Sequence, residues 1–248
     1  FWSNDQTNEQ QFGLLSFDFG EKLKIKVDGD VTDWEGEEPL FESTVKTQNL
    51  QRFFMTSDEK YIYFRLDYQN MSPEQMEQDK TMLLFDTING QGSKDISKDP
   101  ELKTSSGIDF ILNLTGKETS RLTVHSYYDA FYYQYAEDLG LIEEKNYASK
   151  KDNDVFHPIR LALNKQLTIP STSETFPFDD YETGILTYGN GNPESEDYNS
   201  LSDFIVKENS IEIRLPWALF NVKDPSDKEI MGDMWKEGLK ASKKVDRF

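Results

Sequence analysis

Residues 126–135 carry the densest set of side chains in this chain that could bind a ligand. The segment places tyrosines and a phenylalanine around Asp129 and Gln134. A saccharide presents apolar C–H faces edged by hydroxyls, so its site needs flat rings with carboxylates or amides beside them. Tyr127 and Tyr132 would supply rings and hydroxyls. The alternative is that these tyrosines only pack against a sheet.

Further rings follow on the same long segment. Tyr181 and Tyr188 flank Gly184 and could form an opposing wall of the site. The expected ligand-binding residues are therefore Tyr127, Asp129, Tyr132, Gln134, Tyr181 and Tyr188.

Residues 86–95 form a loop rich in Asp, Asn and Gly. Calcium takes several oxygen ligands from loops that can wrap tightly, and glycines permit such wrapping. Asp86, Asn89 and Asp95 are the expected ligands of a structural calcium, the one cofactor that we expect. The spacing is not that of an EF-hand, so an ordinary turn is the alternative. The acidic residues within 28–33 form a second candidate of the same kind.

The sequence offers little for catalysis. His125 and His157 are the only histidines, they are not spaced as a metal-binding pair, and there is no cysteine. No Gly-x-Ser-x-Gly nucleophile motif occurs. A glycosidase needs two carboxylates, but among 46 acidic residues a pair cannot be chosen. We therefore expect no enzyme, with a glycoside hydrolase as the last alternative.

Period-two alternation predicts a protein made mostly of strands separated by polar turns, which favours an antiparallel sandwich. The expected strands are 22–27, 50–55, 60–68, 81–86, 107–114, 120–128, 184–188, 203–207 and 210–215. Short helices are expected at 72–78 and in the tail at 227–239, and residues 129–141 are expected to form either a short helix or an extended aromatic loop. Trp34 and Trp217 are expected to pack where strands meet turns. In the last strand Ile211, Ile213 and Leu215 should point inward, and Glu212 and Arg214 outward.

Composition limits the partners. The net charge of −19 disfavours nucleic acid and anionic lipid, because both would be repelled. It suits neutral or cationic ligands. The absence of cysteine excludes disulfides, and no apolar run is long enough to insert this chain in a membrane.

Several segments resemble the family-9 carbohydrate-binding modules and the DOMON-related domains. Residues 25–36 (IKVDGDVTDWEG) are similar to the opening of those β-sandwiches. Residues 61–68 (YIYFRLDY), 81–86 and 107–112 (GIDFIL) are similar to later strands, and residues 211–220 (IEIRLPWALF) to a strand that meets a helical turn through proline. The resemblance does not extend to the segment of about 127–199.

This resemblance implies an all-β fold: an antiparallel β-sandwich with jelly-roll or immunoglobulin-like layers and a few short helices. We expect residues 1–248 to form a single domain with an aromatic-rich insertion at about 127–199, as a fragment of a larger protein. The implied function is a non-catalytic accessory module that stacks a glycan or polysaccharide on exposed rings. An interaction or structural sandwich without sugar binding is the alternative.

The resemblance also sets the expected surroundings. The module would be attached to a catalytic or membrane domain of the same polypeptide. It would lie outside the cell or on its surface, in a bacterium. Neither nucleic acid nor membrane insertion by this chain is expected.

Overall fold

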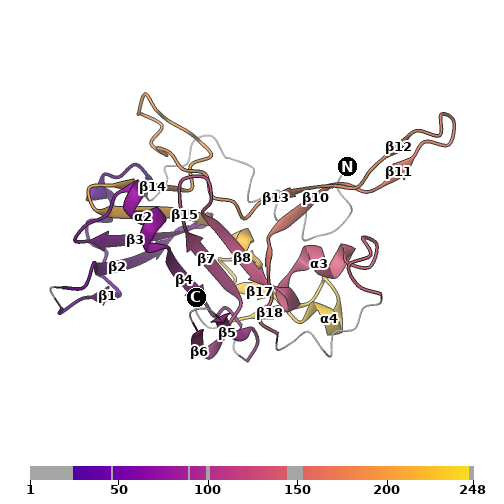
Figure 1. The fold of residues 1–248 in the computed structure, drawn as a ribbon, viewed down its shortest axis with the longest axis horizontal. Coiled ribbons are helices and arrows are strands. Elements are labelled where there is room, and N and C mark those ends of the chain that lie inside the picture. The colour runs from indigo at the N-terminus through magenta and orange to yellow at the C-terminus, as the bar shows by residue number, and fades with distance from the viewer. Residues whose placement is uncertain (1–24, 46, 89, 99–100, 144–152, 246–248) are drawn as a thin grey trace.

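The computed structural model describes residues 25–45, 47–88, 90–98, 101–143 and 153–245. They form a mostly β protein with several antiparallel sheets and a few short helices (Figure 1). The prediction of an antiparallel all-β protein is confirmed at this level. The described residues contain no helix with the length and apolar character needed to cross a membrane.

The largest sheet has five strands in the order β1-β2-β3-β15-β14. Their bounds are Phe41–Glu42, Leu50–Ser57, Tyr61–Tyr68, Ser210–Pro216 and Phe204–Lys207. The two central strands come from distant parts of the chain, with Phe64 opposite Ile213. The strands predicted at 50–55, 60–68, 203–207 and 210–215 are therefore confirmed.

A four-stranded sheet has the order β4-β7-β8-β9. These strands span Thr81–Phe85, Phe110–Leu114, Arg121–His125 and Phe156–Pro158. The strand predicted at 107–114 is interrupted at Asp109, and its first residues belong to β6 (Glu101–Ile108), which pairs with β5 (Ser93–Lys98). The strand predicted at 120–128 ends at His125, where a 3-10 turn (Ser126–Tyr128) begins.

One apolar cluster, here called the main core, joins the two larger sheets. It contains Phe64 of β3 and Phe110 of β7 among its fully buried residues. The Phe64 and Phe85 rings lie 5.4 Å apart, and Phe85 meets Phe220 edge-on at 5.0 Å. Contacts between rings of different sheets therefore hold the two sheets against each other.

The opposite face of the five-stranded sheet is also buried, which the alternation of residues 210–215 did not predict. Glu212 and Arg214 were expected in solvent, but they are 0% and 5% exposed. The N-terminal described segment covers Glu212, since Ile25 and Trp34 form a second apolar cluster there with Tyr63. Arg214 instead donates a hydrogen bond to the Ser202 carbonyl at 2.6 Å. The strand predicted at 22–27 falls partly outside the described residues, and residues 25–27 are buried but not a strand.

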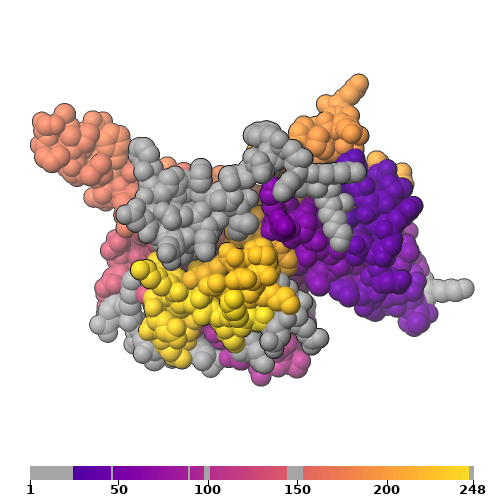
Figure 2. Space-filling view, turned by 180° about the vertical axis from the view of Figure 1, so that it is seen from behind, coloured from indigo at the N-terminus to yellow at the C-terminus, as the bar shows by residue number. Residues whose placement is uncertain are grey.

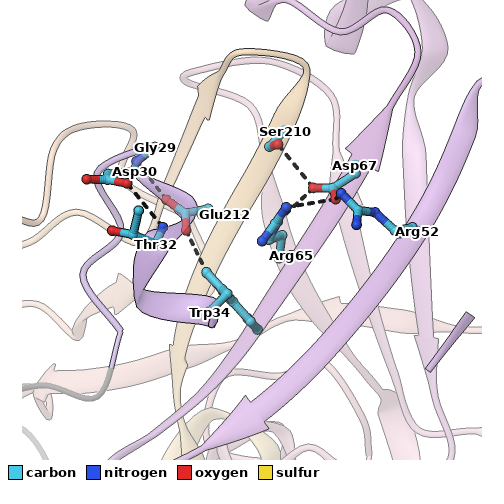
Figure 3. Close-up of polar contacts among 9 residues, drawn as sticks. All are labelled: Gly29, Asp30, Thr32, Trp34, Arg52, Arg65, Asp67, Ser210 and Glu212. Carbon is cyan, nitrogen blue, oxygen red and sulfur yellow. Dashed lines mark hydrogen bonds and ion pairs between the residues drawn. The ribbon is translucent and has the colours of Figure 1, made fainter. Parts of the chain in front are cut away.

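Glu212 is the polar anchor of this covering segment (Figure 3). Its two oxygens accept hydrogen bonds from the Trp34 indole nitrogen at 2.7 Å and the Gly29 backbone nitrogen at 2.6 Å. Trp34 therefore packs at a junction, as predicted, and so does Trp217, which is 5% exposed. The burial of Glu212 raises its pKa to about 7, although both hydrogen bonds oppose that change.

A second polar group on the same face centres on Asp67 (Figure 3). Arg65 donates two hydrogen bonds to its carboxylate, at 2.7 and 2.9 Å. Arg52 lies 2.8 Å from it, and the Ser210 hydroxyl donates at 3.1 Å. These contacts cross from β3 to both neighbouring strands, so they fix the register of the sheet.

The tail is not the amphipathic helix predicted at 227–239. It forms a three-stranded sheet of β16 (Val222–Asp224), β17 (Glu229–Met231) and β18 (Ser242–Lys244), with only a short helix α4 (Met234–Glu237). The apolar residues named by the helical pattern are nevertheless buried: Met231 and Met234 are each 1% exposed. The apolar spacing identified the buried residues but not the secondary structure.

Residues 160–182 form a ribbon, here called the arm, that projects from the body (Figures 1 and 2). It consists of β10 (Arg160–Asn164) paired with β13 (Asp179–Glu182), and β11 (Leu167–Thr168) paired with β12 (Thr175–Phe176). The strand predicted at 184–188 is absent, and only isolated bridges occur there.

Candidate binding site

The site begins with a short helix in the aromatic segment, α3 (Ala130–Tyr135), which is one of the two alternatives expected for residues 129–141. Asp129 is its N-cap: one carboxylate oxygen accepts a hydrogen bond from the Tyr132 backbone nitrogen at 3.1 Å. The other oxygen lies 2.8 Å from the Nδ1 atom of His157 in β9. One buried carboxylate therefore ties the helix to the edge of the four-stranded sheet.

The side chain of Tyr132 lies against this link. Its ring centroid is 4.6 Å from that of His157, with 55° between the planes. Burial, and then the charge of Asp129, raise the pKa of Tyr132. The phenol is therefore protonated at neutral pH and can donate a hydrogen bond beside a half-buried ring.

The base of the arm supplies a charged pair. Arg160 in β10 and Asp180 in β13 face each other, with 2.6 Å between Nη1 and Oδ1. Their side chains are 40% and 22% exposed. Such partly exposed groups keep hydrogen-bonding capacity for a ligand while their position is held by each other.

These groups line one cavity of about 650 Å³, here called the ring pocket. Its wall includes Phe131, Tyr132 and His157 as rings, and Asp129, Arg160 and Asp180 as charged groups. Leu139 and Leu141 add apolar surface. The volume lies within the range of about 300–1,000 Å³ found for small-molecule sites.

Two of the predicted ligand-binding residues, Asp129 and Tyr132, are therefore together in the ring pocket. Tyr127 is not: it is 2% exposed, and its hydroxyl donates to Asp233 Oδ1 at 2.8 Å. Its ring packs near Trp235, with 6.2 Å between the centroids. Tyr127 belongs to the main core. This agrees with the alternative for the aromatic segment, in which the tyrosines pack inside the protein.

The other predicted residues lie elsewhere. Gln134 is half-buried on α3 and does not line the pocket. Tyr181 is 61% exposed on the arm, opposite Leu161. Tyr188 packs edge-on against Phe204, 5.3 Å between centroids, so it forms no opposing wall to Tyr132.

Sequence reasoning did not select three pocket residues, His157, Arg160 and Asp180, and it included Phe131 only as part of the aromatic segment. His157 is 28 residues from its partner Asp129, so no local spacing connects them. Arg160 and Asp180 meet only because β10 pairs with β13. These strands are short and have no fully buried residue, so no clear alternation indicated the pair.

The expected calcium ligands are not brought together in the described residues. Asp86 follows β4 and lies at a different cavity, while Asp95 is on β5 with Lys103 at 3.7 Å. Asn89 lies outside the described residues. No group of three or more His, Asp or Glu able to hold a metal occurs in the part of the chain that is described.

The start of that loop is held by a buried carboxylate. Oδ2 of Asp109 accepts hydrogen bonds from the Thr87 and Ile88 backbone nitrogens, both at 2.8 Å, and from the Thr87 hydroxyl at 3.0 Å. Burial raises the pKa of Asp109 to about 6 despite these hydrogen bonds. The tight turn after β4 therefore has an explanation within the protein.

Fold and site together define a mostly antiparallel β protein with a cavity walled by rings and paired charges. No protein-family model matches the chain. Neither the curated proteins nor the solved structures give a significant match.

Proposed function

We propose that this chain is a non-catalytic saccharide-binding module whose site is the ring pocket. The observation that carries the proposal is the composition of that single cavity, in which Tyr132 and His157 present rings beside Arg160 and Asp180. Rings suit the apolar faces of a sugar, and the charged groups suit its hydroxyls. The pocket is also large enough for one or a few sugar units.

The state of the carboxylates supports binding rather than hydrolysis. Asp129 is shared between the helix α3 and His157, and Asp180 is paired with Arg160. A glycosidase needs one carboxyl group that delivers a proton and a second that acts as base or nucleophile. Carboxylates held by such partners are better suited to accept hydrogen bonds from a ligand.

The architecture that we propose is a β-sandwich with the five- and four-stranded sheets as its two layers. The contact between the Phe64 and Phe85 rings, which lie on different sheets, supports this arrangement. It agrees with the resemblance to the family-9 modules and DOMON-related domains. With it we propose an extracellular or surface location in a bacterium and attachment to a catalytic or membrane domain.

The second candidate is an interaction or structural module without sugar binding. The burial of Tyr127 favours it, because this ring of the aromatic segment serves the core and not the surface. The two candidates differ in one measurable property, which is saccharide binding at the ring pocket.

Affinity electrophoresis against a panel of soluble polysaccharides, followed by calorimetry with the best oligosaccharide, tests the proposal. We expect Tyr132→Ala to weaken binding by about five- to ten-fold, since a lost ring contact is worth about 1 kcal/mol. Tyr132→Phe keeps the ring and should retain most of the affinity. Arg160→Ala should weaken binding without removing a ring.

Tyr181→Ala is the matched control, because Tyr181 is an exposed tyrosine of the arm that does not line the pocket. It should bind as the wild type does. Absence of binding across the panel, in a protein whose circular dichroism shows a folded β structure, would leave the interaction module as the function. Turnover of an aryl glycoside would instead favour a hydrolase.

A further inference from the structure

A second cavity, here called the apolar cavity, lies where β2 and β3 approach β4 of the other sheet. Its volume is about 660 Å³. It shares no lining residue with the ring pocket. Its size is again that of a small-molecule site.

The floor of the apolar cavity comes from the main core. Ile62, Phe220 and Ile230 are 9%, 3% and 1% exposed and line it. Trp217 adds an indole face whose nitrogen already donates to the Asp58 carbonyl at 3.0 Å. The floor therefore offers contact area to an apolar group and no free indole N–H.

The rim has a different character. Met55 at the rim is 37% exposed, so the cavity is open to solvent. Thr56, Ser57 and Thr87 also line it, the Thr87 hydroxyl being bound to Asp109, and Asp86 contributes the one ionisable group of the described lining. No lysine or arginine is among these lining residues, so the described part of the lining has one formal charge and it is negative.

We propose that the apolar cavity is a binding site for a small amphipathic cation, an ammonium group attached to an apolar body. The apolar body would cover Phe220 and Ile230, and the ammonium would lie at Asp86. The net charge of −19 on the whole chain favours the approach of a cation. An apolar floor with a single carboxylate at the rim is poorly suited to a sugar, which carries hydroxyls on all edges.

Three probes of one chain length test the proposal: n-octylammonium, n-octanol and n-octanoate. They share the apolar body and differ in the charge of the head. We expect n-octylammonium to bind more tightly than n-octanol, by on the order of two- to five-fold for a partly exposed ion pair, and n-octanoate to bind least. Calorimetry at neutral pH and low salt measures the three affinities.

The place of binding is read from methyl resonances. The branched aliphatic residues that line the apolar cavity are Ile62, Leu84, Val222, Ile230 and Val245, whereas the ring pocket has Leu139 and Leu141. Methyl shifts confined to the residues of the apolar cavity are expected. Methyl shifts at Leu139 and Leu141, or no binding of any probe, would overturn the proposal.

Variants assign the charge preference to one side chain. Asp86→Asn should make the affinities for n-octylammonium and n-octanol equal, whereas Asp95→Asn, a matched loss of charge outside the cavity, should leave the preference unchanged. Ser57→Phe adds a ring at the rim and should weaken all three probes. A preference for ammonium that survives Asp86→Asn would refute the role of this carboxylate.

Discussion

Glu212 is the buried residue of β15 that holds the N-terminal described segment against the five-stranded sheet. Its neighbours Ile211 and Ile213 face the main core, so a polar residue between them reads as solvent-exposed. The segment that carries Trp34 covers this second face and supplies donors to both carboxylate oxygens. A buried, hydrogen-bonded carboxylate therefore organises the entry of the chain into the fold.

The raised pKa of Glu212 makes stability depend on pH. The folded protein holds this proton up to about pH 7, whereas in the unfolded chain it is lost near the ordinary value of 4.5. Between these values the folded state binds more protons, so the free energy of unfolding falls as pH rises. A shift of this size corresponds to a decrease of about 3 kcal/mol. Asp109 and Asp203, each raised to about 6, act in the same direction.

Glu212→Gln removes the titration at this position. We expect the decrease in unfolding free energy between pH 4.5 and 7 to become smaller by about 3 kcal/mol. Chemical denaturation at several pH values measures this decrease. The readout is the slope of the unfolding free energy against pH, because the glutamine amide faces the same two donors and can change the stability at every pH. Glu35→Gln, an exposed neighbour, should keep the wild-type slope. Identical slopes in wild type and Glu212→Gln would contradict the assignment.

For single residues, the sequence predicted two members of the ring pocket. It selected Asp129 and Tyr132 because of their types, and both line the ring pocket. It could not separate them from Tyr127, since burial depends on Asp233 and Trp235 more than a hundred positions away. The partner His157 was equally out of reach, because only strand pairing brings β9 beside α3.

Among the elements, α3 shows how a few residues hold a site. It has six residues, which is too short to be stable without tertiary contacts. Asp129 supplies both its N-cap and its link to β9. This carboxylate therefore helps to hold Tyr132 in the ring pocket, together with the packing of its ring near Trp235.

Asp129→Ala should lower the free energy of unfolding by about 2 kcal/mol, because a cap and a buried hydrogen bond are lost together. It should also release the Tyr132 ring from its place near His157. Urea denaturation measures the first effect, and the chemical shifts of the His157 ring measure the second. Asp138→Ala, at an exposed position shortly after the helix, is the control and should stay within about 0.5 kcal/mol of wild type.

Element types were predicted well where alternation was long and turns were clear, as in β3, β15 and α2 (Pro73–Asp79), whose cap is Ser72. The prediction for the tail was wrong because Met231, Met234 and Trp235 have helical spacing but do not lie on one helix. Met231 belongs to the strand β17 and the other two to the short helix α4, and all three are buried. The arm was missed for the opposite reason: its short strands carry few buried residues, so they lack a clear alternation.

In the molecule as a whole, stability comes from contacts between distant segments. The main core gathers residues from β3, β7, β8, β15 and the tail sheet. The pairing of β3 with β15 joins an early segment of the chain to a late one. The hydrogen bond from Tyr128 to the Met231 carbonyl joins the tail to the middle of the chain. These long-range contacts explain why motifs predicted the strands better than their arrangement in sheets.

The arm lies outside this network along most of its length. From Gln166 to Pro177 no residue belongs to either apolar cluster, and Leu167 and Phe176 are 58% and 44% exposed. Phe178 at its base does contact the body, with its ring 5.4 Å from that of Tyr135. The tip should therefore contribute little to folding, while the base positions the ring pocket.

Replacing residues 166–177 with Asn-Gly tests this division. Lys165 follows Asn164, and Phe178 precedes Asp179, which is paired with Asn164, so a two-residue turn suits the junction. We expect the free energy of unfolding to change by less than about 0.5 kcal/mol, and saccharide affinity at the ring pocket to be retained. Phe178→Ala, at the base, should instead destabilise the protein through the lost ring contacts. A shortened arm that unfolds at much lower denaturant would show that the tip is part of the cooperative unit.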